Sequence, residues 1–240
     1  MKINEFLSEF LPGLLFTSRC RFCNRLIRQG EKLCDECAAH IPLIEGERCG
    51  YCGAGKDRCD CKKKKNGYDG ITSPFYYEDA VRSCISRFKF NGKMFLAEIL
   101  TDYMAQQVKK DFDGIDFDFI CFVPFTPVQS FLRSYNQSEI LAEKLAEKLN
   151  IPFKAALVKL FETSAQHEML SGNRKGNVFG VYDVKNRTDV RDKTILLVDD
   201  VKTTGSTLDE CAWILKIRGA KSVYCVTAAL AGLRSKKEKL

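Results

Sequence analysis

The chain has 240 residues, of which 45% are hydrophobic, and a formal net charge of +7 at neutral pH. This size and apolar content are sufficient for a full-sized core together with a small additional module. Twelve cysteines would suit a secreted disulfide scaffold, but no secretory signal begins the chain and the cysteine pairs have metal-ligand spacing, which excludes that class. No apolar run reaches membrane-spanning length, so we expect a soluble protein in a reducing compartment, with no membrane insertion.

A short amphipathic helix is predicted for residues 1–16. Its apolar positions recur at helical spacing and are interrupted by Glu5 and Glu9. The segment is too short and too acidic to cross a bilayer, and it lacks the basic start of a signal peptide.

Residues 17–67 are predicted to form a cysteine-rich metal-binding module. Three Cys-x-x-Cys pairs are followed by a Cys-x-Cys pair, and eight thiolates at this spacing suit two tetrahedral, structural zinc sites. Because the segment has few large apolar residues, closed thiolate sites would supply folding free energy that burial cannot. The expected ligands are Cys20, Cys23, Cys34, Cys37, Cys49, Cys52, Cys59 and Cys61.

The sequence is compatible with two ways of dividing these eight ligands between the two ions. Sequential pairing places the first four cysteines on one ion and is favoured, whereas a cross-braced arrangement interleaves the pairs. An iron–sulfur cluster is the chemical alternative, although knuckles of this type usually hold zinc. His40 could be an imidazole ligand, but eight thiolates already fill two sites, which favours a surface histidine. The remaining cysteines fall at apolar positions and are predicted to be small core residues: Cys84, Cys121, Cys211 and Cys225.

Lysine runs concentrate positive charge at residues 62–65 and at Lys236, Lys237 and Lys239. Such runs are usually solvated. The alternative is attraction to nucleic acid or another polyanion, because clustered lysines release counterions from phosphates.

Residues 68–240 have the pattern of an α/β domain with a parallel sheet flanked by helices. The apolar run at 119–124 is typical of a strand buried on both faces, and the strand, helix and strand that follow residue 194 predict a right-handed crossover whose helix ends at Gly219. In chain order we expect a strand at 71–77, helices at 81–90 and 94–108, a strand at 119–124, a helix at 137–149, a strand at 155–160, an exposed loop at 163–177, a strand at 194–198, a helix at 206–218 and a strand at 222–230.

A ligand site is predicted where the strand at 194–198 ends, because ligands of open α/β sheets lie beyond the carboxyl ends of the strands. Gly205 would let the backbone approach a ligand closely, and the neighbouring amides would lie at a helix N-terminus, which favours a phosphate. Asp199 and Asp200 would accept hydrogen bonds from ribose hydroxyls or hold a magnesium ion. The other members of the candidate site are Val201, Lys202, Thr203, Thr204, Ser206 and Thr207.

The string from Ile195 to Thr207 resembles the signature of type I phosphoribosyltransferases, in which four apolar residues, two acids and Thr-Thr-Gly bind a ribose 5-phosphate. The resemblance implies a phosphoribosyltransferase-like parallel sheet for residues 68–240, with phosphoribosyl diphosphate and magnesium as ligands.

A second set of motifs is spread along the chain: Phe88-Lys89-Phe90, Val123-Pro124, Arg133 to Ser138, Gln166, Arg174, Asn177 and Phe179. Together they resemble the ComF competence family, and the resemblance extends over nearly the whole chain, including the cysteine module. Phe88-Lys89-Phe90 is similar to that family's Leu-Lys-Tyr element. In its Arg-Gly-Phe-Asn-Gln element Ser134 and Tyr135 replace Gly and Phe, and Asn136 and Gln137 could hold this loop in shape.

Basic residues near the predicted site could contact a diphosphate. Arg133, Arg174 and Lys175 lie on loops that could fold over the strand ends, and the fork of arginine suits phosphate oxygens. The alternative for both arginines is a solvated or helix-capping role. Lys89 is equally compatible with ligand contact and with none.

Two classes of function follow. The ComF resemblance implies a role in natural transformation, with single-stranded DNA and a helicase-like partner, in the cytoplasm and at the inner face of the membrane through partners. The signature taken literally implies a phosphoribosyltransferase that releases pyrophosphate as an unidentified acceptor attacks. The fold does not decide between them, because the same site in regulators binds phosphoribosyl diphosphate without turnover.

Overall fold

The computed structural model describes residues 17–59, 61, 66–125, 135–160 and 181–232. Several features predicted from the sequence lie outside these residues: the helix at 1–16, the lysines at 62–65 and near the C-terminus, the loop at 163–177, and Arg133, Arg174 and Lys175.

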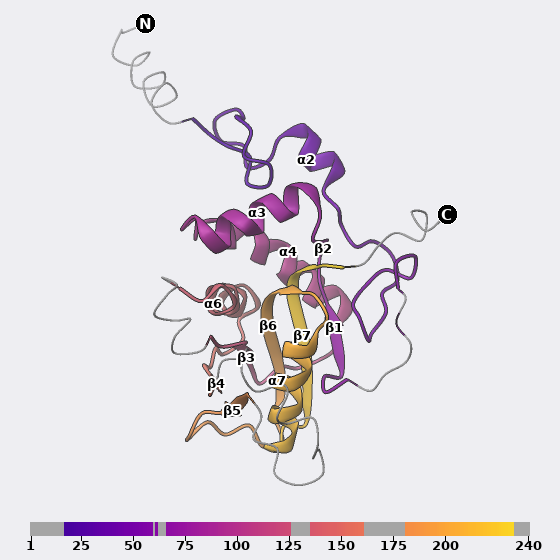
Figure 1. Cartoon of the computed structure of the whole chain (residues 1–240), viewed down its shortest axis with the longest axis vertical. Coiled ribbons are helices and arrows are strands. Elements are labelled where there is room, and N and C mark those ends of the chain that lie inside the picture. Colours follow the sequence, from indigo (N-terminus) through magenta and orange to yellow (C-terminus); the bar gives the residue numbers. More distant parts are fainter. Residues whose placement is uncertain (1–16, 60, 62–65, 126–134, 161–180, 233–240) are drawn as a thin grey trace, which may run out of the picture.

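A five-stranded parallel sheet forms the centre of the main domain (Figure 1). Its order is β1 (Gly70–Thr72), β7 (Ser222–Leu230), β6 (Thr194–Lys202) and β3 (Phe119–Phe122), and β2 (Phe75–Tyr76) also pairs with β7. Because every pair is parallel, the carboxyl ends of the strands meet at one edge, where a ligand site is expected.

Helices cover both faces of this sheet (Figure 1). On one face lie α3 (Asp79–Phe90), α4 (Leu96–Asp111) and α6 (Gln137–Leu149), and on the other lies α7 (Ser206–Ile217). Side chains of β6 alternate between the two layers: Leu196 and Val198 belong to the core of the first, and Ile195 and Leu197 to the core with α7. Burial on both faces explains the uninterrupted apolar run of this strand.

The four cysteines predicted to be core residues are confirmed as such, since Cys84, Cys121, Cys211 and Cys225 are fully buried. The helix at 137–149 and the strand at 222–230 are observed with the bounds predicted from the sequence. None of the helices in the described part of the chain has the length and apolarity required to cross a membrane.

Two strand predictions need correction. The stretch 71–77 is two short strands separated by Ser73 and Pro74, because proline has no backbone N–H to give to a ladder. The strand predicted at 194–198 continues to Lys202, since β7 supplies backbone partners beyond the apolar run. A further strand, β5 (Tyr182–Val184), was not predicted, and it pairs antiparallel with β4 (Leu157–Lys159) beside the main sheet.

The cysteine module packs against the main domain at two places. Phe22 is fully buried, and its ring lies edge-on to Phe75 at 5.4 Å. Ile44 and Cys52 form a smaller buried cluster with Tyr76 and Leu230. The only regular helix described in the module is α2 (Asp35–His40). The division at residue 67 stays a prediction, but the two parts share apolar cores.

Candidate functional site

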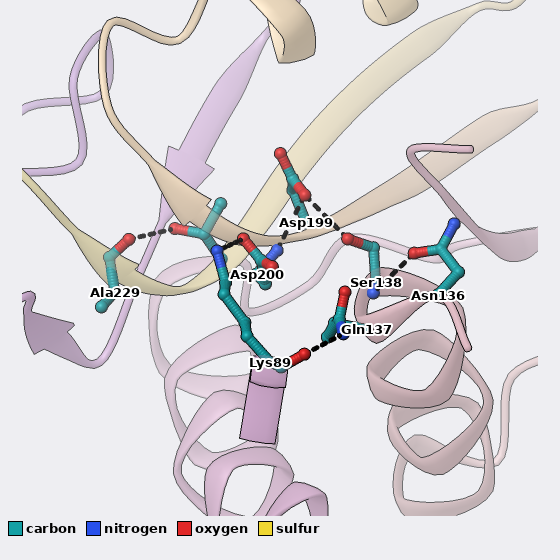
Figure 2. A network of polar contacts seen from close by, with 8 residues as sticks. Lys89, Asn136, Gln137, Ser138, Asp199, Asp200 and Ala229 are labelled. Atoms are coloured by element: carbon teal, nitrogen blue, oxygen red, sulfur yellow. Dashed lines mark hydrogen bonds and ion pairs between the residues drawn. The ribbon is translucent and has the colours of Figure 1, made fainter. Parts of the chain in front are cut away.

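Asp199 and Asp200 lie on the last part of β6 and leave the strand in different directions (Figure 2). The Oδ1 atom of Asp199 accepts hydrogen bonds from the Ser138 hydroxyl at 2.7 Å and from the Asp200 backbone N–H at 2.8 Å. The Oδ1 atom of Asp200 accepts one from the Lys89 ammonium at 2.8 Å. The start of α6 and the end of α3 therefore hold the two carboxylates.

The two carboxylates lie in different electrostatic environments. Burial, and then the charge of Asp200, raise the pKa of Asp199 from 3.8 to about 7, although the Ser138 hydrogen bond opposes the rise. The Lys89 and Asp200 side chains are only 20% and 14% exposed, so their ion pair is less screened than one at the surface. Lys89 thus stabilises the negative charge of Asp200.

A second set of contacts holds the segment that follows β3. Asn136 caps α6: its side chain accepts from the Ser138 backbone N–H at 3.0 Å and donates to the Val123 carbonyl at 3.1 Å. Gln137 donates to the Lys89 carbonyl at 3.1 Å (Figure 2). Asn136 and Gln137 therefore hold the local backbone in shape, which is the role expected for them from the sequence.

The turn after β6 presents polar groups at the N-terminus of α7. Gly205 is the N-cap with φ +86°, and a Cβ added there would lie 2.8 Å from Cε of Lys202. Glycine is therefore favoured by the backbone conformation, and any larger residue would also displace the Lys202 side chain. Thr203, Thr204, Ser206 and Thr207 are exposed, whereas Val201 is half-buried and Lys202 is buried. First-turn amides of a helix are suited to bind an anion.

The eight knuckle cysteines form two separate groups, each with its four Sγ atoms within 4.8 Å of one another. Neighbouring Sγ atoms are 3.6 Å apart for Cys23 with Cys34 and for Cys52 with Cys59, and Cys61 lies 3.3 Å from Cys49 and 3.2 Å from Cys59. These separations are slightly shorter than the roughly 3.8 Å expected when four thiolates surround zinc at about 2.3 Å. The grouping is the sequential one, Cys20 to Cys37 and Cys49 to Cys61. His40 is exposed and belongs to neither group.

The structure brings Lys89, Asp199 and Asp200 together beside the turn, but the three predicted loop cations lie outside the described residues. Ser138 was missed as a contact of Asp199. It stands 61 residues earlier in the chain, and a serine in the first turn of a helix is ordinarily explained by capping. Its place directly after Asn136 and Gln137 was the available signal.

Two family models match the chain, and together they cover most of it. A double zinc ribbon domain matches residues 11–67, and a phosphoribosyl transferase domain matches residues 136–240. Competence protein F of Haemophilus influenzae is 26% identical over 219 residues, covering 87% of this chain and 95% of that protein. The chain is a ComFC-like protein.

Two other relatives are similar to most of this chain. The ComFC-like chain is 28% identical to DNA utilization protein YhgH of Salmonella typhimurium, covering 92% of this chain and 99% of that protein. It is 27% identical to Competence protein ComFC of Streptococcus pneumoniae, covering 80% and 84%. A solved purine phosphoribosyltransferase from Pyrococcus horikoshii matches with a TM-score of 0.36 and 22% identity, covering 55% of this chain and 71% of that one. The zinc ribbon match and the thiolate geometry together support structural zinc.

Proposed function

We propose that this ComFC-like protein binds phosphoribosyl diphosphate with magnesium at the end of β6 and acts in the uptake and use of single-stranded DNA. The observation that carries the first part is the pair of carboxylates, Asp199 and Asp200, held by Ser138 and Lys89 beside the glycine turn. Two acids next to a phosphate-binding turn suit a ligand that carries both a diol and phosphates.

The carboxylates fit the ribose and the magnesium ion. Each uses its Oδ1 atom in the contacts described, and each Oδ2 could accept a ribose hydroxyl or face a cation. Magnesium is usually bound by one or two carboxylates, with waters and substrate phosphates completing its shell. The 5-phosphate would lie against the amides of Ser206 and Thr207, with hydroxyls of the 203–207 turn as further donors.

The diphosphate, at the end of the ribose away from the 5-phosphate, would be bound by cationic side chains. Lys89 already lies at the carboxylates, and the remaining candidates are Arg133, Arg174 and Lys175, which the sequence predicts to lie on loops. A guanidinium fork matches the oxygens of a phosphate, so these side chains would fix the ligand's orientation.

Transfer of the ribose 5-phosphate to an acceptor is the alternative function of the same site. In that reaction the bond between the anomeric carbon and the diphosphate breaks, diphosphate leaves with the electron pair, and an acceptor forms the new bond. Preorganised cations would stabilise the charge that develops on the leaving group. No acceptor is identified by the described residues, so binding without turnover is the simpler proposal.

Calorimetric titration of the intact protein with phosphoribosyl diphosphate and magnesium tests the proposal. We expect binding that requires magnesium and is stronger than binding of ribose 5-phosphate, because the diphosphate adds contacts to the metal and to Lys89. Absence of binding would contradict the proposal. Release of pyrophosphate during incubation with candidate acceptors would instead favour the enzyme.

An exposed aromatic and basic surface supports the second part of the proposal. Phe95 and Met94, in the turn between α3 and α4, are 49% and 50% exposed, and the Arg21 guanidinium lies 4.6 Å from the centre of the Phe95 ring. Bases of single-stranded DNA stack on such rings while cations contact the backbone. The lysines at 62–65 would attract the DNA backbone without preference for its base sequence. The protein would act in the cytoplasm, or at the inner face of the membrane through a helicase-like partner.

Substitution at these two places should weaken binding of an oligonucleotide in fluorescence anisotropy. Phe95→Ala removes a stacking contact that typically contributes roughly 1–3 kcal/mol per base. Replacing Lys62, Lys63, Lys64 and Lys65 together by Ala should make the negative slope of log affinity against log salt concentration shallower by about 3. Affinity for phosphoribosyl diphosphate should not change in either variant. No binding at low salt, or binding unchanged by both substitutions, would contradict this role.

A further inference from the structure

The last turn of α3 connects the first cysteine cluster to the candidate ligand site. Arg87 points to the cluster: its Nη2 atom donates to the backbone carbonyls of Arg21 at 2.6 Å and Phe22 at 2.7 Å. Lys89, two residues later, points to the strand end and donates to Asp200 at 2.8 Å (Figure 2). One helical turn therefore contacts both sites.

The carbonyls that Arg87 contacts lie inside a metal-binding knuckle. Arg21 and Phe22 are the two residues between Cys20 and Cys23, and the knuckle backbone is further fixed by the bond from the Asn24 N–H to the Cys20 carbonyl at 3.0 Å. A closed tetrahedral site holds such a turn rigidly. Arg87 therefore has a fixed acceptor pair only while the knuckle keeps its shape.

The other side of the same turn is held by the segment that carries Ser138. Tyr135 donates its hydroxyl to the Phe88 carbonyl, and Gln137 donates to the Lys89 carbonyl at 3.1 Å. The end of α3 thus lies between the zinc knuckle and the segment that contacts Asp199. Helix ends fray when they are not held. Fraying of this turn would move the backbone of Lys89 away from Asp200. The many rotamers of the lysine side chain would then no longer be restricted to the one that contacts the carboxylate.

We propose that Arg87 is a positioning residue through which the first zinc site holds Lys89 at Asp200, so that ligand affinity depends on that knuckle. The inference rests on the proposed binding of phosphoribosyl diphosphate. Arg87 is not among the residues proposed to contact that ligand. Arginine contributes more than a lysine would, because its Nη2 atom donates to the two carbonyls while its Nη1 atom donates to the Asn24 side-chain oxygen at 3.4 Å. The single ammonium of lysine has no second nitrogen for that contact.

A double-mutant cycle on the full chain tests this link. Arg87→Ala should lower the affinity for phosphoribosyl diphosphate with magnesium about 5-fold or more, and Lys89→Ala about 10-fold or more. If Arg87 acts through Lys89, the double variant should match Lys89→Ala within about 2-fold, because coupled residues are not additive. Arg87→Lys should recover only part of the loss.

Arg48 provides a matched control at the second zinc site. It also anchors a cysteine cluster to the main domain, through Gln107 at 2.8 Å and Asp111 at 3.2 Å, but these contacts do not include the end of α3. Arg48→Ala should lower the unfolding temperature and leave ligand affinity within about 2-fold of the unsubstituted protein. Cys23→Ser should weaken ligand binding as Arg87→Ala does, whereas Cys61→Ser should not.

Unchanged affinity in Arg87→Ala while Lys89→Ala binds weakly would overturn the inference alone. Fully additive losses in the double variant would also overturn it, since they would show that Arg87 acts independently of Lys89. Failure of the unsubstituted protein to bind phosphoribosyl diphosphate would instead overturn the proposed function together with this inference. Zinc content, measured on each variant, separates loss of the Arg87 contact from loss of the metal.

Discussion

Replacing Asp200 by asparagine should lower the affinity for phosphoribosyl diphosphate with magnesium by roughly 10–100-fold, since a hydrogen bond to a charged group contributes about 1.5–3 kcal/mol. An amide carries no negative charge for the Lys89 ammonium, which lies 2.8 Å from the carboxylate. It is also a poorer ligand for magnesium, which prefers carboxylates and phosphates. Isothermal titration calorimetry, with and without magnesium, measures the loss.

Asp199→Asn should weaken the same binding and also change the pH dependence of folding. Burial and the Asp200 charge raise the pKa of Asp199 to about 7 in the folded protein, from an ordinary value of 3.8. The folded state therefore holds this proton more tightly than the unfolded state, and stability falls as pH rises from about 4 through 7. That contribution is absent in the variant, so its unfolding temperature should change less between about pH 5 and about pH 8.

Asp118 offers a control with the same change of side chain. It lies at the opposite edge of the sheet, just before β3, where it pairs with Lys193 at 2.9 Å and accepts from the Thr194 backbone N–H at 2.9 Å. Asp118→Asn should leave ligand affinity unchanged. If calorimetry shows unaltered affinity for both Asp199→Asn and Asp200→Asn, the assignment of the site is wrong.

The secondary structure was predictable wherever apolar side chains and capping agreed. Residues 137–149 have both a helical apolar pattern and the capping asparagine Asn136, and their bounds were predicted correctly. The end of β6 was not predicted correctly, because the strand continues past both acids, with Asp199 opposite Thr227 and Val201 opposite Ala229 of β7. Backbone pairing leaves no mark in hydrophobic periodicity, so the strand seemed to stop at the first acid.

The candidate site was predictable in its contiguous part only. Residues 199–207 form one string in the sequence, and Gly205 was expected to allow close approach of the backbone to a ligand. Its positive φ is a further reason for glycine that was not predicted from the sequence. The contacts of Ser138 and Lys89 with these residues span 61 and 111 positions. Such pairs follow from how α3 and α6 pack on the sheet, which pattern and spacing do not specify.

The packing of the cysteine module against the main domain could also not be predicted from the sequence. The spacing of the cysteines predicted two metal sites, and the thiolate geometry agrees with the sequential pairing that was favoured. It did not predict that Phe22 would be buried with Phe75 and Tyr103 of the main domain. A large apolar residue within a knuckle is compatible with packing inside the module or outside it.

Removing zinc should therefore destabilise more than the module itself. Binding of structural zinc by short thiolate-rich segments contributes apparent free energies of about 10–16 kcal/mol at neutral pH, and this is largely folding free energy. Phe22 and Ile44 belong to apolar clusters that include residues of the main domain, so unfolding of the module exposes surface on both parts. A strong chelator should lower the unfolding temperature measured by circular dichroism, and added zinc should restore it.

Metal analysis of the purified protein should find about two zinc ions per chain, one for each group of four thiolates. The double variant Cys20→Ser with Cys37→Ser should keep one ion, because the four Sγ atoms from Cys49 to Cys61 form a separate group. A cross-braced arrangement would instead lose both ions in this variant, since each ion would share ligands with the altered pairs. Iron with visible absorbance, or a single ion in the unsubstituted protein, would contradict the assignment, because eight thiolates in two closed groups leave no ligand to spare.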